Sequence, residues 1–177
     1  MPGLRPRYMQ TQGQTGQEEY CCVCEENDCL ITLSSRYDMV LFADGEEVVT
    51  HGNRCDCIIV LRRNNVIEAY SIELKRISNA NQTGALNPDK LRQKWGNCLK
   101  WALNIINNFN SVSSRSINIR NYVVLVIPKD VLQNTATLIK RQKHRYKPRI
   151  PSAGRIQGRI LLCNSSIIDK DKYIKLF

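Results

Sequence analysis

Two β-rich segments joined by Asn64-Asn65 constrain the fold of this chain more than any other feature. The segments read "CDCIIVLRR" and "VIEAYSIELKR". Asparagine tolerates the left-handed backbone angles of a tight turn, so the pattern predicts an antiparallel hairpin. Reflection through a turn centred between the two asparagines makes Asp56 the direct cross-strand neighbour of Glu73, with Cβ atoms about 4.5–5.5 Å apart.

The end of this hairpin carries three charged side chains, Asp56, Glu73 and Lys75. Residues two apart in a strand point to the same face, so Lys75 should lie beside Glu73. Two adjacent carboxylates need a cation or a shared proton, and Mg²⁺ is usually held by one or two carboxylates with waters and phosphate oxygens. A metal held in this way supports phosphodiester hydrolysis. The structural alternative is a cross-strand charge cluster on a solvated face.

The remaining elements follow from periodicity and capping signals. Asn87 as N-cap, with Pro88 at the first helical position, begins a helix whose Gln93 lies on a polar stripe. We predict helices over 28–43, 87–109 and 130–142, and strands over 46–51, 55–63, 66–76, 121–128 and 158–163. This order predicts an α/β fold with a mixed central sheet flanked by helices.

The acid that starts one strand, followed by Glu73-x-Lys75 on the next, resembles the motif of the PD-(D/E)xK nuclease superfamily over residues 28–127. The resemblance implies a restriction-endonuclease-like αβββαβ core and Mg²⁺ or Mn²⁺ as cofactor. Asp56, Glu73 and the backbone carbonyl of Leu74 would be metal ligands, and Lys75 would activate water. The family's usual proline before the first acid is replaced here by Cys55.

Some members of the superfamily add further groups, and several residues here compete for those roles. Among the upstream acids Glu26, Asp38, Glu46 and Glu47, we favour Glu47 as an additional metal ligand. The RecB-like and Holliday-junction-resolvase-like branches place a glutamine or a basic residue on the following helix. Gln93 suits this catalytic role, with Lys90 or Lys94 as a phosphate contact. In size and tail charge the chain also resembles archaeal and archaeal-virus nucleases. His51 is a candidate substrate contact or proton carrier, but a turn histidine without a catalytic role is favoured.

The net charge of +10 is concentrated in the last third of the chain. Residues 1–110 carry 12 Lys/Arg and 13 Asp/Glu, a net of −1, whereas residues 111–177 carry 14 and 3, a net of +11. Such asymmetry predicts a surface that contacts nucleic acid, mainly through phosphates. Tyr146 is a candidate for base stacking, and Arg155 and Arg159 continue the basic surface. The predicted phosphate contacts are Arg54, Arg76, Lys94, Lys140, Arg141, Lys143, Arg145, Lys147 and Arg149.

Eight cysteines are many for an intracellular chain. Four lie in "CCVCEENDC" at 21–29, and Cys55 and Cys57 should point to one face of their strand. Zinc sites usually need two separated pairs, so we favour buried thiols or disulfides over zinc or an iron–sulfur cluster. Intracellular disulfides would fit a hyperthermophile.

Length and composition predict one domain over residues 20–177, with a basic last third, after a disordered arm at 1–19. No apolar run is long enough for a bilayer and no apolar leader is present, so we expect a cytoplasmic protein without membrane contact. The expected function is that of a metal-dependent deoxyribonuclease acting on duplex or branched DNA, in the host cell if the source is viral. We expect a homodimer. The alternatives are a Holliday-junction resolvase and a non-catalytic nucleic-acid-binding protein on the same scaffold.

Overall fold

A mixed six-stranded sheet forms the centre of the computed structural model, which describes residues 20–26, 29–34, 39–49, 51–75, 77, 84, 86–110, 117–166 and 173–177. The strand order is β3-β4-β5-β6-β7-β9. β3 to β5 form an antiparallel meander, β5 to β7 run parallel, and β9 is antiparallel to β7. The strands span Met39–Asp44 (β3), Cys57–Arg63 (β4), Val66–Leu74 (β5), Asn118–Ile127 (β6), Ile156–Leu162 (β7) and Ile174–Lys175 (β9). The predicted α/β class is confirmed.

The β4–β5 hairpin has the predicted register. Arg63 pairs with Val66 and Cys57 pairs with Ile72, so the pairing is centred between the two turn asparagines. Asn64 has a φ of 55°, which is the left-handed conformation that asparagine tolerates in a turn.

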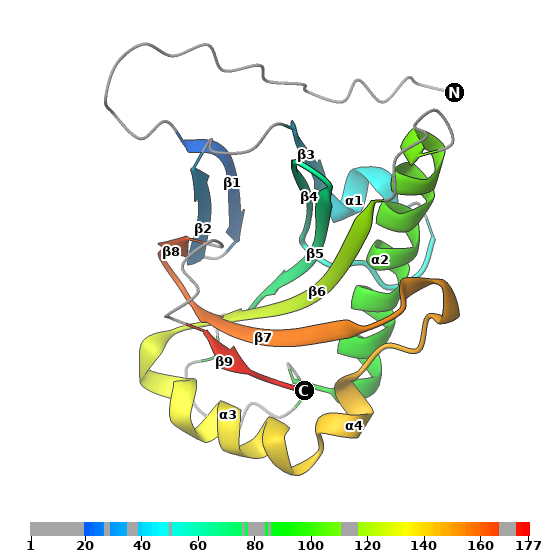
Figure 1. Ribbon diagram of the computed structural model, residues 1–177. Helices are drawn as coiled ribbons and strands as arrows, with labels where there is room; N and C mark the ends of the chain where they lie inside the picture. Colours follow the sequence, from blue (N-terminus) through cyan, green and yellow to red (C-terminus); the bar gives the residue numbers. More distant parts are fainter. Residues whose placement is uncertain are drawn as a thin grey trace.

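All described helices pack on one face of this sheet (Figure 1). The longest, α2 (Pro88–Asn110), connects β5 to the parallel strand β6. Its N-cap is confirmed, because Asn87 Oδ1 accepts hydrogen bonds from the backbone N–H groups of Asp89 and Lys90 at 3.0 and 3.1 Å. The shorter helical elements are α1 (Gly45–Val48), η1 (Lys129–Val131), α3 (Leu132–Arg141), α4 (Lys143–Tyr146) and η2 (Pro151–Ala153).

The other face of the sheet is covered by a small three-stranded sheet, visible in Figure 1 on the opposite side from α2. Its strands are β1 (Tyr20–Glu26), β2 (Cys29–Ser34) and β8 (Ser165–Ser166). Each face therefore has its own apolar core. Along β4, Ile58 and Val60 belong to the helix-side core, whereas Ile59 and Leu61 belong to the core beneath the small sheet.

Two sequence-based predictions in the N-terminal half are wrong. Residues 28–43, predicted as a helix, form β2 and the greater part of β3, with 35–38 outside the described residues. Buried Cys29 and Ile31 follow the period of two that a half-buried strand requires. Within 46–51, predicted as a strand, α1 forms because the Asp44 side chain accepts a hydrogen bond from Glu46 N at 2.7 Å. The predicted first helix of the αβββαβ order is therefore absent at that place.

Among the described residues, three disulfides connect segments that are distant in sequence: Cys24–Cys57, Cys29–Cys163 and Cys55–Cys98. The prediction of buried thiols or disulfides is confirmed, but that of one face for Cys55 and Cys57 is wrong. Cys55 precedes β4 and bonds to α2 in the helix-side core, whereas Cys57 bonds to β1 beneath the small sheet. Disulfides form in oxidising compartments and inside the cells of hyperthermophiles. The predicted intracellular location would therefore require such a cell. Among the described residues, no helix is both long and apolar enough to cross a membrane.

Replacement of Gly96 by alanine should stabilise the protein. A Cβ at this mid-helix position would meet Pro148 Cβ at 3.9 Å, an ordinary contact, and alanine favours the helix by about 1 kcal/mol. We expect the thermal midpoint to rise by about 2–4 °C. The contrasting variant is Gly158→Ala, whose Cβ would lie 2.7 Å from Leu176 Cβ and should lower the midpoint. A lowered midpoint for Gly96→Ala would contradict this packing.

Candidate functional site

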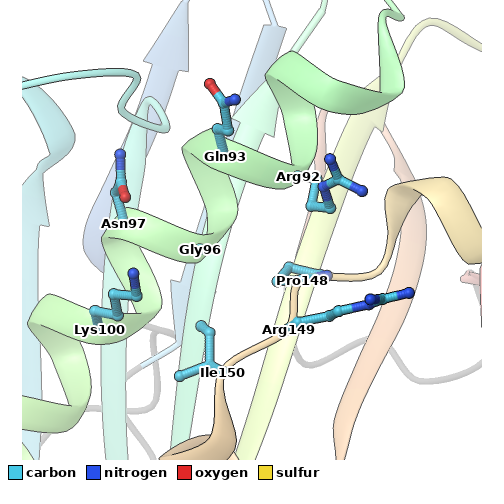
Figure 2. Close-up of a pocket in the computed structure, with 8 residues that line it drawn as sticks. All are labelled: Arg92, Gln93, Gly96, Asn97, Lys100, Pro148, Arg149 and Ile150. Atoms are coloured by element: carbon cyan, nitrogen blue, oxygen red, sulfur yellow. The ribbon is translucent and has the colours of Figure 1, made fainter.

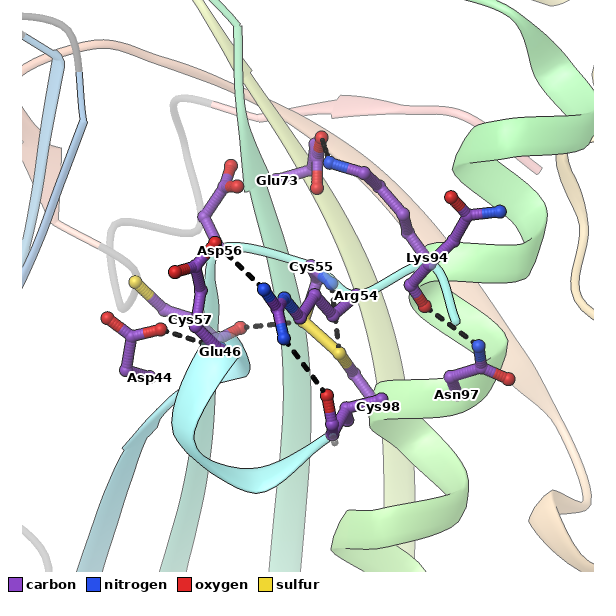
Figure 3. Close-up of a disulfide and its surroundings, with 12 residues drawn as sticks. Asp44, Glu46, Arg54, Cys55, Asp56, Cys57, Glu73, Lys94, Asn97 and Cys98 are labelled. Atoms are coloured by element: carbon purple, nitrogen blue, oxygen red, sulfur yellow. Dashed lines mark hydrogen bonds and ion pairs between the residues drawn. A yellow bond between two sulfur atoms is a disulfide. The ribbon is translucent and has the colours of Figure 1, made fainter. Parts of the chain in front are cut away.

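Four charged residues meet at the C-terminal end of β5: Asp56, Glu73, Lys75 and Lys94 (Figure 3 draws Asp56, Glu73 and Lys94). We call them the carboxylate–lysine cluster. The Glu73 side chain is 0% exposed, and its Oε1 lies 2.5 Å from the Nζ atoms of both Lys75 and Lys94. Lys75 directly follows β5, whereas Lys94 comes from α2. The cluster therefore depends on the packing of α2 against the sheet.

Asp56 is held from both sides by backbone hydrogen bonds. Its N–H donates to Ile72 O and its carbonyl accepts from Gly45 N, each at 3.0 Å. Its carboxylate Oδ2 accepts from Leu74 N at 2.6 Å. Because Leu74 is the residue after Glu73, the two predicted carboxylate residues meet at the same end of the hairpin.

The residues immediately before and after Asp56 are both cysteines that form disulfides. Cys55 is bonded to Cys98 of α2, and Cys57 is bonded to Cys24 of β1. Figure 3 shows the first of these beside the carboxylate–lysine cluster. The backbone at Asp56 is thus covalently tied to the layers on both faces of the sheet.

The cluster holds two carboxylates and two lysine amines, and both amines lie on the same oxygen of Glu73. Lys94, predicted as a phosphate contact, supplies a second cation to Glu73 that the sequence did not reveal. Nevertheless Glu73 Oε2 is buried and has no hydrogen-bond partner among the described residues. Burial of an unpaired acceptor is costly, so this oxygen is suited to accept a further ligand.

The donor set fits a hard divalent cation. Asp56 and Glu73 provide carboxylate oxygens, the ligands that Mg²⁺ prefers, and Mg²⁺ sites often use only one or two carboxylates. No group of three or more His, Cys, Asp or Glu side chains suited to a metal occurs in the part of the chain that the structure describes. Among the described residues, further ligands would therefore be backbone, water or substrate oxygens.

The other predicted site residues lie around the cluster or outside the described residues. Gln93 is exposed on α2 and its Oε1 accepts a hydrogen bond from Asn53 Nδ2 at 2.6 Å. Arg54 is half-buried and forms an ion pair with Glu46 at 3.4 Å. The backbone of Glu47 lies in α1, but its side chain, like Asp38 and Arg76 as a whole, is outside the described residues.

The cations of the predicted basic segment are exposed at the end of α3 and in and after α4, whereas its tyrosine is buried. Tyr146 is 1% exposed, and its hydroxyl donates to Leu86 O at 2.9 Å. Burial raises the pKa of Tyr146, so the hydroxyl remains a donor. Its predicted role in base stacking is therefore wrong. The exposed cations are Lys140, Arg141, Lys143, Arg145, Lys147 and Arg149.

Arg159, predicted to extend the basic surface, is 7% exposed in the core beneath the small sheet. Its guanidinium lies over the rings of Tyr122 and Tyr173, at 3.9 and 4.4 Å from their centroids. Burial, followed by the nearby Glu68 carboxylate, raises the pKa of Tyr122, which stays protonated. Arg159 is thus a structural cation, whereas Arg155 is exposed as predicted.

The sequence did not predict a groove beside Gln93. Arg92, Gln93, Asn97 and Lys100 of α2 face Pro148 to Ile150 across a cavity of about 400 Å³ (Figure 2). The signal was present in the polar stripe of α2, but the segment that lies opposite it could not be read from the sequence. Comparison with protein-family models, curated proteins and solved structures finds no match for this chain.

Replacement of Gly45 by alanine should disturb the cluster. A Cβ there would lie within bonding range of the Cys55 carbonyl oxygen, so the backbone next to Asp56 would have to move. We expect the free energy of unfolding to fall by about 1–3 kcal/mol, measured by denaturant titration. Gly84→Ala is the matched control, since its Cβ would meet nothing within 4 Å. Equal stability of the two variants would contradict the described packing of Gly45 on Cys55.

Proposed function

We propose that the carboxylate–lysine cluster is the active site of a metal-dependent nuclease that hydrolyses DNA phosphodiester bonds. The observation that carries the proposal is the buried Glu73 carboxylate, which keeps one unpaired oxygen beside Asp56 and two lysine amines. A charged group is rarely buried in this way unless its chemistry requires it. The combination supports the resemblance to the PD-(D/E)xK motif.

Asp56 and Glu73 would hold Mg²⁺ or Mn²⁺, with the Leu74 carbonyl as a further ligand. The metal, when bound, supplies a Lewis acid for the phosphate and lowers the pKa of a bound water. The chain's own groups then orient the reaction. Because its amine already lies at Glu73, Lys75 can hold the attacking water at the cluster.

Lys94 would offset the negative charge that develops on the phosphate, because its amine shares the same Glu73 oxygen. Gln93 is one residue away, and Asn53 fixes its carbonyl end, so its amide N–H groups can donate to a phosphate oxygen. Lys94, predicted from the sequence as a phosphate contact, is therefore proposed as a member of the catalytic group. The first alternative function is that of a Holliday-junction resolvase, whose substrate is four-way-junction DNA. The second is that of a non-catalytic nucleic-acid-binding protein.

Removal of the Glu73 charge should abolish cleavage. We expect Glu73→Gln and Lys75→Ala to lower the rate of DNA cleavage in Mg²⁺ or Mn²⁺ at least about 100-fold. EDTA should stop the reaction. The substrates are linear, circular and four-way-junction DNA of equal concentration, and faster cleavage of the junction would select the resolvase alternative.

The charge-removal control is Arg63→Ala, which changes an exposed residue at the turn end of β4, opposite the cluster. This variant should cleave at the wild-type rate. Cleavage that persists in Glu73→Gln and Lys75→Ala, or that is absent from the wild-type protein with both metals, would refute the proposed function.

Loss of the Cys55–Cys98 disulfide should impair cleavage more than loss of Cys29–Cys163. Both double Cys→Ser variants lose a cross-link worth about 2–5 kcal/mol, and the second closes the longer loop, 134 residues against 43. Only the loss of Cys55–Cys98 removes a covalent link next to Asp56. Cleavage rates are compared at a temperature where circular dichroism shows both variants folded. An equal loss in both would contradict a positioning role for Cys55–Cys98.

A further inference from the structure

A basic groove runs beside the carboxylate–lysine cluster. It comprises two adjoining cavities of about 400 and 510 Å³, which share Pro148, Arg149 and Ile150 as a common wall. On one side of this wall lies α2 with Arg92 and Lys100 (Figure 2). On the other side lie His144 and Lys147, followed by η2.

The groove is lined by cationic side chains together with amide, small and apolar residues. Four arginines and lysines line it, with no aspartate or glutamate among the lining residues. Arg92 forms an ion pair with Asp89 at 2.9 Å. In contrast, Lys100, Lys147 and Arg149 have no acidic partner within the described part of the chain. Three unneutralised cations around one groove favour a polyanionic ligand.

The groove and the cluster share one turn of α2. Gln93 lines the groove, and the next residue, Lys94, places its amine on Glu73. Asn97 also lines it and donates to the Asn53 carbonyl at 2.8 Å, three residues before Asp56. A chain of phosphates lying in the groove would therefore reach the cluster along α2.

The lining offers little surface on which unstacked bases could stack. It contains no Phe, Tyr or Trp, the tyrosine of the basic segment, Tyr146, is buried, and His144 is the one aromatic ring in the lining. Proteins that bind single strands gain about 1–3 kcal/mol per base from aromatic stacking, of which little is available here. Phosphate contacts alone suit a backbone whose bases are already stacked in a duplex.

We infer that the groove binds one phosphodiester backbone of duplex DNA and guides it to the carboxylate–lysine cluster. Its role as a substrate path depends on the proposed function, but its role as a binding site does not. Lys100 and Arg149 are the principal contacts, one from each wall, and neither side chain forms an ion pair with a described residue.

The test measures binding in EDTA, where no cleavage interferes. A fluorescent 30-base-pair duplex is titrated with wild-type protein and with Lys100→Ala/Arg149→Ala. We expect at least about 10-fold weaker binding by the variant at low salt, and a slope of log Kd against log salt reduced by about 1.8, or 0.9 for each lost contact. The wild-type protein should bind the duplex at least about 10-fold more tightly than a single strand of equal length.

The matched control is Arg62→Ala/Arg63→Ala, which removes the same charge at the turn end of the β4–β5 hairpin. It should retain most of the affinity, and thermal denaturation checks that both variants are folded. Equal weakening in the two double variants, or equal affinity for single strand and duplex, would overturn the inference. Groove-dependent binding without metal-dependent cleavage would support the groove while refuting the nuclease activity.

Discussion

The pairing of β4 with β5 holds the candidate site together. Its register, with Cys57 opposite Ile72, brings Asp56 to the backbone beside Glu73 and turns Glu73 toward α2. A shift of one residue would reverse the faces of β5 and direct Glu73 into the apolar core beneath the small sheet. The left-handed Asn64 fixes this register at the other end of the hairpin. A local turn thus determines where a buried charge lies about 26 Å away, at roughly 3.3 Å per residue from Asn65 to Glu73.

Rigidity around Asp56 comes from several independent sources. Backbone hydrogen bonds from Gly45 and to Ile72 hold its peptide groups, and the disulfides at Cys55 and Cys57 tie it to opposite layers. A site that must hold a carboxylate within a fraction of an ångström benefits from such support. The same arrangement makes the site dependent on oxidising conditions or on a cell that preserves intracellular disulfides.

The sequence predicted those parts of the fold that have local signals. The Asn-Asn turn, the Asn87 cap and the helix that follows this cap have signals within a few residues, and all three are confirmed. The prediction for the N-terminal half was wrong because residues 28–43 satisfy both a helical and a strand pattern. The disulfides that stabilise the strands there join residues far apart in sequence, so they give no local signal. The position of Lys94 on Glu73 and the burial of Tyr146 and Arg159 likewise depend on which elements pack together.

The central claim is that Asp56 and Glu73 form a metal site, and direct metal binding tests it without any substrate. Isothermal titration calorimetry with Mn²⁺ on the oxidised protein should give one ion bound per chain. Asp56→Asn and Glu73→Gln should each abolish that binding, while thermal denaturation shows both variants folded. Absence of Mn²⁺ binding to the wild-type protein, or unchanged binding in both variants, would contradict the account.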